Sequence, residues 1–221
     1  MIKKFFTFFI SLALLALLLF QIPAEAEISE EQVRHAWREV TRIAEMDELP
    51  LDVKDEKAPN AWVTAGKSVT VTTGLMKLLE REEEMFGVLM HEAGHAKLGH
   101  YESRVKNSVG IGLLALVLSE ALDSTLGDIA AGVGAGLATA GFSREQEVAA
   151  DDFATDLAFK GEKDPTGLHT ALERMALAGG KTQPSGFNSH PPDDRRLQRI
   201  KNRILERDPD AVFPEVKKPE D

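Results

Sequence analysis

The segment His91-Glu92-Ala93-Gly94-His95 constrains the fold of this chain more than any other feature. Side chains at positions i and i+4 of an α-helix lie on the same face, so a helix here brings both imidazole rings together. Neutral imidazoles are suitable ligands for zinc, and the carboxylate of Glu92 lies close enough to hold a water molecule without being a ligand. The spacing therefore predicts a helix with a metal site on one face.

The motif alone leaves a simpler interpretation open, because a chain with six histidines can contain this spacing by chance. In that interpretation both histidines are solvated, and the helix buries Met85, Leu89 and Ala93. A catalytic zinc site needs three protein ligands and an open position. A further carboxylate or histidine must therefore come from another part of the chain.

A second acidic segment offers this third ligand. Glu147 and Asp151 are spaced i and i+4 in a segment that predicts a helix, with Ser143 as its N-cap. Glu147 can bind the metal, and Asp151, one turn later, can accept a hydrogen bond from a ligand imidazole and fix its tautomer. The alternative is an acidic first turn that interacts favourably with the helix dipole.

The composition excludes several other classes of protein. The chain has no cysteine, which rules out disulfides, thiol catalysis and zinc sites with cysteine ligands. A formal net charge of −10 argues against nucleic-acid binding, because no basic face would neutralise phosphates. With 221 residues and a hydrophobic fraction of 43%, the chain suits one globular domain.

The N-terminal region has the pattern of a secretory signal peptide. Lys3 and Lys4 precede an apolar run over 5–20, and an Ala-x-Ala sequence ends at Ala26. The run is short for the hydrocarbon core of a bilayer, which favours cleavage over an uncleaved membrane anchor. We therefore predict a signal peptide over 1–26 and export to the periplasm or cell envelope.

Periodicity and turn residues divide the rest of the chain into a single domain over 27–207 and a tail over 208–221. The tail carries three prolines and mixed charge, which predicts disorder. A short strand or connection is expected over 49–59. The predicted helices span 29–45, 75–83, 84–100, 143–159, 166–178 and 193–207, and a predicted β-hairpin spans 60–74.

The segment 108–142 differs from the rest, since it holds seven glycines and few charges. We interpret it as a buried helical hairpin. The alternative is a surface in peripheral contact with a membrane or an envelope partner. Each of its two apolar halves is too short to span a bilayer.

His-Glu-x-x-His followed by Glu-x-x-Ala-Asp resembles the HtpX-like and BepA-like family of gluzincin metalloendopeptidases. The likeness covers about residues 60–200, although integral-membrane relatives carry spanning helices where this chain has only the segment 108–142. It implies a mainly helical α+β fold of the zincin type, with a small β-hairpin or sheet beside the active-site helix. The further matching stretches are Asn60-Ala61, Thr73-Gly74-Leu75, His100, Ser189-His190-Pro191-Pro192 and Arg196-Leu197.

The same resemblance implies a function. His91, His95 and Glu147 would hold one Zn²⁺ per chain, and Glu92 would be the general base toward a metal-activated water. The expected activity is a zinc metalloendopeptidase that hydrolyses unfolded or misassembled envelope proteins. Its partners would be protein or peptide substrates.

Two further residues are candidates for the chemistry. Arg196 and His190 could each donate a hydrogen bond to the developing oxyanion. For His190 two other roles stay open: a zinc ligand in a resting state, and a cap where the chain enters a helix.

The hairpin suggests how substrate binds, because an extended peptide can join an exposed strand as an added strand. The strand expected to offer this edge comprises Val69, Thr70, Val71 and Thr72.

Two other functions remain as alternatives. The first is an envelope chaperone or assembly factor that has a zincin fold and slow or gated hydrolysis. The second is a metal-binding domain without enzymatic activity, against which the intact Glu92 argues.

Overall fold

The computed structural model describes residues 27–64, 68–103, 141–179, 190 and 193–218. These residues form a small three-stranded sheet and a larger set of helices, which is the mainly helical α+β class predicted from the sequence. The helices are α2 (Glu30–Ala44), α3 (Thr73–Leu78), α4 (Glu82–Lys97), α7 (Arg144–Lys160), α8 (Gly167–Gly179) and α9 (Asp194–Arg207), and the strands are β1 (Leu51–Lys54), β2 (Ala61–Thr64) and β3 (Ser68–Thr72).

Side-chain caps determine where three of these helices begin. Ser29 caps α2, and Gln32 reaches back to the Ser29 backbone to complete a capping box. Ser143 and Gln146 form the same arrangement at the start of α7. The side chain of Asp193 accepts a hydrogen bond from the first turn of α9. The starts predicted for these helices are therefore confirmed to within a residue or two.

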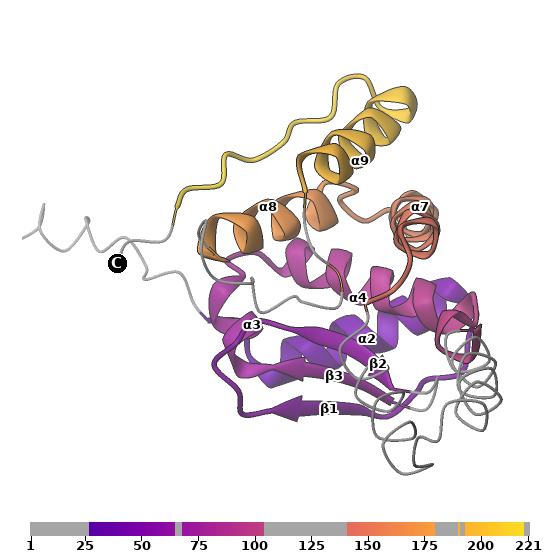
Figure 1. Ribbon diagram of the computed structural model, residues 1–221, viewed down its shortest axis with the longest axis vertical. Helices are drawn as coiled ribbons and strands as arrows, with labels where there is room; N and C mark the ends of the chain where they lie inside the picture. The colour runs from indigo at the N-terminus through magenta and orange to yellow at the C-terminus, as the bar shows by residue number, and fades with distance from the viewer. Residues whose placement is uncertain (1–26, 65–67, 104–140, 180–189, 191–192, 219–221) are drawn as a thin grey trace, which may run out of the picture.

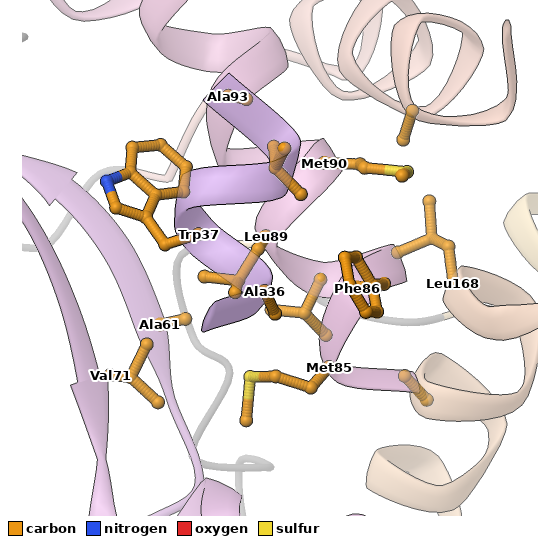
Figure 2. Packing of buried hydrophobic residues seen from close by; sticks show 14 of the residues in the cluster. Ala36, Trp37, Ala61, Val71, Met85, Phe86, Leu89, Met90, Ala93 and Leu168 are labelled. Atoms are coloured by element: carbon orange, nitrogen blue, oxygen red, sulfur yellow. The ribbon is translucent and has the colours of Figure 1, made fainter. Parts of the chain in front are cut away.

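The helix α4 lies at the centre of the fold. In Figure 1 it runs between the sheet on one side and α7 and α8 on the other, and α9 packs outside against α7 and α8. Every side chain from Glu84 to His95 is buried. Figure 2 shows Leu89 near Trp37 of α2 and Val71 of β3, with Leu168 of α8 on the opposite side. A helix that is packed all round holds its polar side chains in an environment from which water is excluded.

The sheet corrects one prediction from the sequence. Its strand order is β1-β3-β2, with β1 parallel to β3 and β2 antiparallel to it. The predicted hairpin is therefore present, but β3 is the middle strand. Its backbone groups are used on both sides, so it cannot receive a substrate strand. The strand that was wrongly expected to be an edge comprises Val69, Thr70, Val71 and Thr72.

Other predictions fall wholly or largely outside the described residues. These are the signal peptide over 1–26 and most of the segment 108–142. None of the described helices is long and apolar enough to cross a membrane. In the tail that was expected to be disordered, Phe213 packs edge-on against the ring of His169, with ring centroids 4.9 Å apart. The described chain thus continues to contact the domain beyond Arg207.

A close approach between α4 and α8 depends on glycine. A Cβ atom added at Gly87 would lie 2.2 Å from the backbone nitrogen of Leu168, and one added at Gly167 would lie 2.0 Å from the carbonyl oxygen of Glu83. We therefore expect Gly87→Ala to lower the free energy of unfolding by about 3 kcal/mol, measured by urea denaturation, because two backbones would have to move apart.

Gly161→Ala is the matched control for Gly87→Ala. There the added Cβ atom would meet the side chain of Ile43 at 2.6 Å, and a side chain can rotate away more easily than a backbone. Its expected cost is about 1 kcal/mol, the low end for an added methyl group in a packed core. Equal losses for the two variants would show that the approach of α4 to α8 is not tight.

Candidate metal centre

Four buried side chains converge beside α4. They are His91 and His95 from α4, Glu147 from α7, and His190, and one potential ligand atom from each lies within 4.8 Å of all the others. The Nε2 atoms of His91 and His95 are 3.1 Å apart. Nδ1 of His190 lies 3.2 Å from Nε2 of His91 and 2.8 Å from Oε1 of Glu147. The structure thus brings together the three predicted metal ligands and places beside them His190, for which a ligand role in a resting state was one of the open alternatives.

Neighbouring residues orient the two imidazoles of α4. Nδ1 of His91 lies 3.0 Å from Oδ1 of Asp151, so it donates its hydrogen there and the Nε2 lone pair faces the cluster. Nδ1 of His95 lies 2.9 Å from Nδ1 of His100, and when His95 is the donor its Nε2 lone pair faces the same point. Two nitrogen lone pairs and a carboxylate therefore point at one another. All three are electron-pair donors, so a divalent cation between them would satisfy them together.

The protonation states also suit metal binding. Burial lowers the pKa of His95 to about 2, so its imidazole is neutral at physiological pH. Burial alone would raise the pKa of Glu147, but the hydrogen bond from His190 and the closeness of the His95 and His91 rings outweigh this effect and hold that pKa far below its usual value. Glu147 is therefore a carboxylate, and nitrogen and carboxylate donors together are typical zinc ligands.

Glu92 has the surroundings of a reactive carboxylate rather than a structural one. It is buried, and neither oxygen has a partner with good hydrogen-bond geometry among the described residues, although the backbone N–H of Val63 is near enough to lower its pKa. Its Oε1 lies 3.5 Å from Nε2 of His190. Burial raises the pKa of Glu92, and the neighbouring rings of His190 and His91 oppose that effect. An unsatisfied buried carboxylate is costly, which is consistent with a role in binding or catalysis.

Asp151 and Arg196 form a buried network behind the metal ligands. Arg196 donates from Nη2 and Nε to the two oxygens of Asp151, at 2.7 and 3.0 Å. Its Nη1 lies 2.9 Å from the backbone oxygen of His190 and 3.0 Å from Oε2 of Glu147. Asp151 lies where the sequence predicted it. Arg196, by contrast, is held against the ligands and positions them, which differs from the oxyanion role considered for it.

The same network continues outward between α7 and α9. Arg199 bonds to Asp151 and Asp152, and farther along Arg203 and Arg207 both pair with Asp156. These contacts dock α9 onto α7 and thereby hold Arg196 in place.

Two contributors to the site had no predicted role. His100 was identified only as a match to the family pattern, although its position five residues after His95 is a signal for a role beside that ring. Phe142 was not singled out at all, and its ring stacks on His95 with centroids 3.9 Å apart and on His190 with centroids 5.2 Å apart. No local pattern marks Phe142, because its partners are distant in the sequence.

A buried helix with two histidines in i and i+4 positions, a glutamate between them and another glutamate from a second helix defines the ligand set of the His-Glu-x-x-His metallopeptidases. The comparison with known families gives the more specific result. The chain belongs to Peptidase family M48, whose family model matches residues 27–204.

Individual relatives agree with this assignment. Metalloprotease YcaL of Escherichia coli (strain K12) is 41% identical over 153 residues, which cover 66% of this chain and 58% of the relative. Metalloprotease LoiP of the same organism is 31% identical over 155 residues, which cover 67% of this chain and 60% of the relative. The mitochondrial metalloendopeptidase OMA1 of Arabidopsis thaliana is 26% identical over 144 residues, which cover 65% of this chain and 29% of the relative. The chain thus matches about three fifths of the length of the two bacterial relatives.

Proposed function

We propose that this protein is a zinc metalloendopeptidase that hydrolyses unfolded or misassembled proteins of the cell envelope. The observation that carries the proposal is the convergence of His91, His95 and Glu147 next to the buried carboxylate of Glu92. The family membership supports the class of activity. Zinc is the metal that best suits two imidazoles and a carboxylate in a site without cysteine.

Each residue of the centre has a separate role in the proposed hydrolysis. A zinc ion held by His91, His95 and Glu147 would supply Lewis acidity to the peptide carbonyl and to a water molecule. Glu92 takes the proton of the attacking water and passes it to the leaving amine. Because Nδ1 of His190 already lies among the ligand atoms, we favour a resting state in which His190 is a fourth ligand.

Because β3 is the middle strand, we propose that the substrate pairs with β2 instead. Among the described strands, β2 pairs on one side only, with β3, and it packs against α4. The backbone N–H of Val63 in β2 lies near enough to Glu92 to affect its pKa. A peptide that adds to β2 would therefore pass the catalytic carboxylate. Pairing through the backbone selects extended chains, which unfolded proteins provide.

Export and envelope localisation belong to the same proposal. Their support is the sequence pattern over 1–26, with its two lysines, apolar run and Ala-x-Ala ending. A peripheral contact through 108–142 would place the enzyme at a membrane or an assembly site.

The proposal is tested with purified protein by metal analysis and by digestion of one substrate in two forms, native and reduced carboxymethylated lysozyme. We expect one zinc per chain, cleavage of the unfolded form at least about 100-fold faster than of the native form, loss of activity with a chelator, and recovery with added zinc. His95→Ala should lose the metal, whereas His35→Ala, which removes an exposed histidine from α2, should keep it. Protein without zinc, or without cleavage of either form, would refute the proposal.

A further inference from the structure

A cavity of about 340 Å³ lies next to the metal centre. It is formed between the N-terminal ends of α7 and α9, and its walls include Phe142, Arg144 and Glu147 on one side and Arg195 and Arg199 on the other. We call it the arginine cavity. Glu147 lines the cavity and also belongs to the cluster of metal ligands, so the cavity and the metal centre are direct neighbours.

Phe142 also belongs both to the arginine cavity and to the surroundings of the metal centre. Its ring stacks on His95 and His190 and also lines the cavity. The arginine cavity thus shares two residues, Glu147 and Phe142, with the metal centre, and this is the basis for placing a substrate side chain in it.

The acidic residues in the wall of the cavity already have partners. Glu147 contacts Arg196 and His190, and Asp151 is bonded to Arg196 and Arg199. Asp193 accepts the backbone N–H of Arg196 as the N-cap of α9. Glu147 and Asp151 are thus paired with Arg196 and Arg199, whereas Asp193 keeps its negative charge and accepts only a backbone N–H.

Two arginines of the cavity wall have no carboxylate paired with them in the described ranges. Arg144 and Arg195 are exposed, and neither forms a hydrogen bond or an ion pair with any residue in the described ranges. The N-terminal ends of α7 and α9 add positive partial charge at the same place. Four arginines and three carboxylates line the cavity, so its lining carries one net positive charge, opposite in sign to the net charge of −10 of the whole chain.

We infer that the arginine cavity binds a carboxylate of the substrate, namely the side chain of an aspartate or glutamate close to the scissile bond. The inference rests on the proposed peptidase function and adds to it a preference for acidic residues. Guanidinium groups bind carboxylates through paired N–H donors, while Phe142 and Val148 offer apolar contact to the methylene groups of such a side chain. A lysine side chain would be repelled there.

The test compares amidated peptides that differ at one position beside the cleavage site, with glutamate, glutamine or lysine, at constant ionic strength. For the wild type we expect kcat/KM to be at least about tenfold higher with glutamate than with glutamine, and lowest with lysine. In Arg144→Gln/Arg195→Gln the ratio of glutamate to glutamine should fall to within about twofold of unity. A control, Arg38→Gln/Arg42→Gln, removes the same charge from α2 and should keep the wild-type ratio.

Two further measurements distinguish the inference from alternative explanations. A glutamine peptide with a free C-terminal carboxylate tests whether a chain end, rather than a side chain, is the preferred group, and a preference for it alone would overturn the inference. Binding of the glutamate and glutamine peptides to Glu92→Gln protein, followed by fluorescence anisotropy, tests the cavity without hydrolysis. Equal affinities there would overturn the inference, whereas a preserved preference without cleavage by the wild type would refute only the peptidase function.

Discussion

Glu92→Gln is expected to lower kcat/KM for peptide hydrolysis about 10³-fold while the protein stays folded and keeps its metal. Glutamine has nearly the same shape as glutamate but cannot take a proton from water. The side chain is buried beside the ligands without being one of them, so its replacement leaves His91, His95 and Glu147 in place. The measurement is kcat/KM together with the zinc content and the midpoint of urea denaturation.

Glu84→Gln is the matched control for this variant, because Glu84 is equally buried on the same helix but lies away from the centre. Its Oε1 accepts hydrogen bonds from Arg174, at 3.1 and 3.3 Å. We expect this control to lose stability and to keep catalysis in the folded protein, which is the opposite pattern. Retention of more than a tenth of the activity by Glu92→Gln would contradict the role of general base.

The same Glu92→Gln variant separates hydrolysis from binding as the biological activity. If it still supports the function of the protein in cells while hydrolysis is lost, the chaperone alternative is favoured. If that function is lost together with hydrolysis, the peptidase interpretation stands.

Asp151→Asn is expected to have the second large effect, on stability and on metal binding together. Asp151 is fully buried, and it balances Arg196 and Arg199 while it orients His91. Loss of its charge should lower the free energy of unfolding by about 3 kcal/mol, the low end for a broken buried pair, because Glu147 still faces Arg196. Zinc affinity should fall about 10- to 100-fold, since the orientation of His91 would no longer be held.

These two effects are measured by urea denaturation of the metal-free protein and by competition for zinc with a chromogenic chelator. Asp156→Asn serves as the control, because Asp156 also pairs with arginines of α9, Arg203 and Arg207, but is half exposed. Its expected cost is below about 1 kcal/mol, with no change in zinc affinity. If both variants behaved alike, the network behind the ligands would have no particular effect on the metal.

Much of the candidate site follows from local sequence patterns. The helical spacing of His91 and His95 is sufficient to put both rings on one face, and the same spacing puts Asp151 one turn beyond Glu147. The caps at Ser29, Ser143 and Asp193 are equally local, so the helices begin close to where the sequence predicts.

Other features depended on contacts between distant segments. The four residues of β1 pair in parallel with β3, and this turned the expected edge strand into the middle of the sheet. Arg196 was one of two candidate donors to the oxyanion, and α9 docks so that its guanidinium lies against Asp151 and Glu147. Neither result has a periodic signal in the chain.

By itself, the sequence therefore determined which side chains could form a metal site and on which helices they lie. Only the tertiary structure decided that the ligands on α4 and α7 meet, that Asp151 orients His91, and that β2 is an edge strand that packs against α4. The physical reason is the sequence separation of the interacting residues. Helix periodicity and capping act over about four residues, whereas strand order and the docking of α9 depend on the packing of apolar surfaces from distant segments.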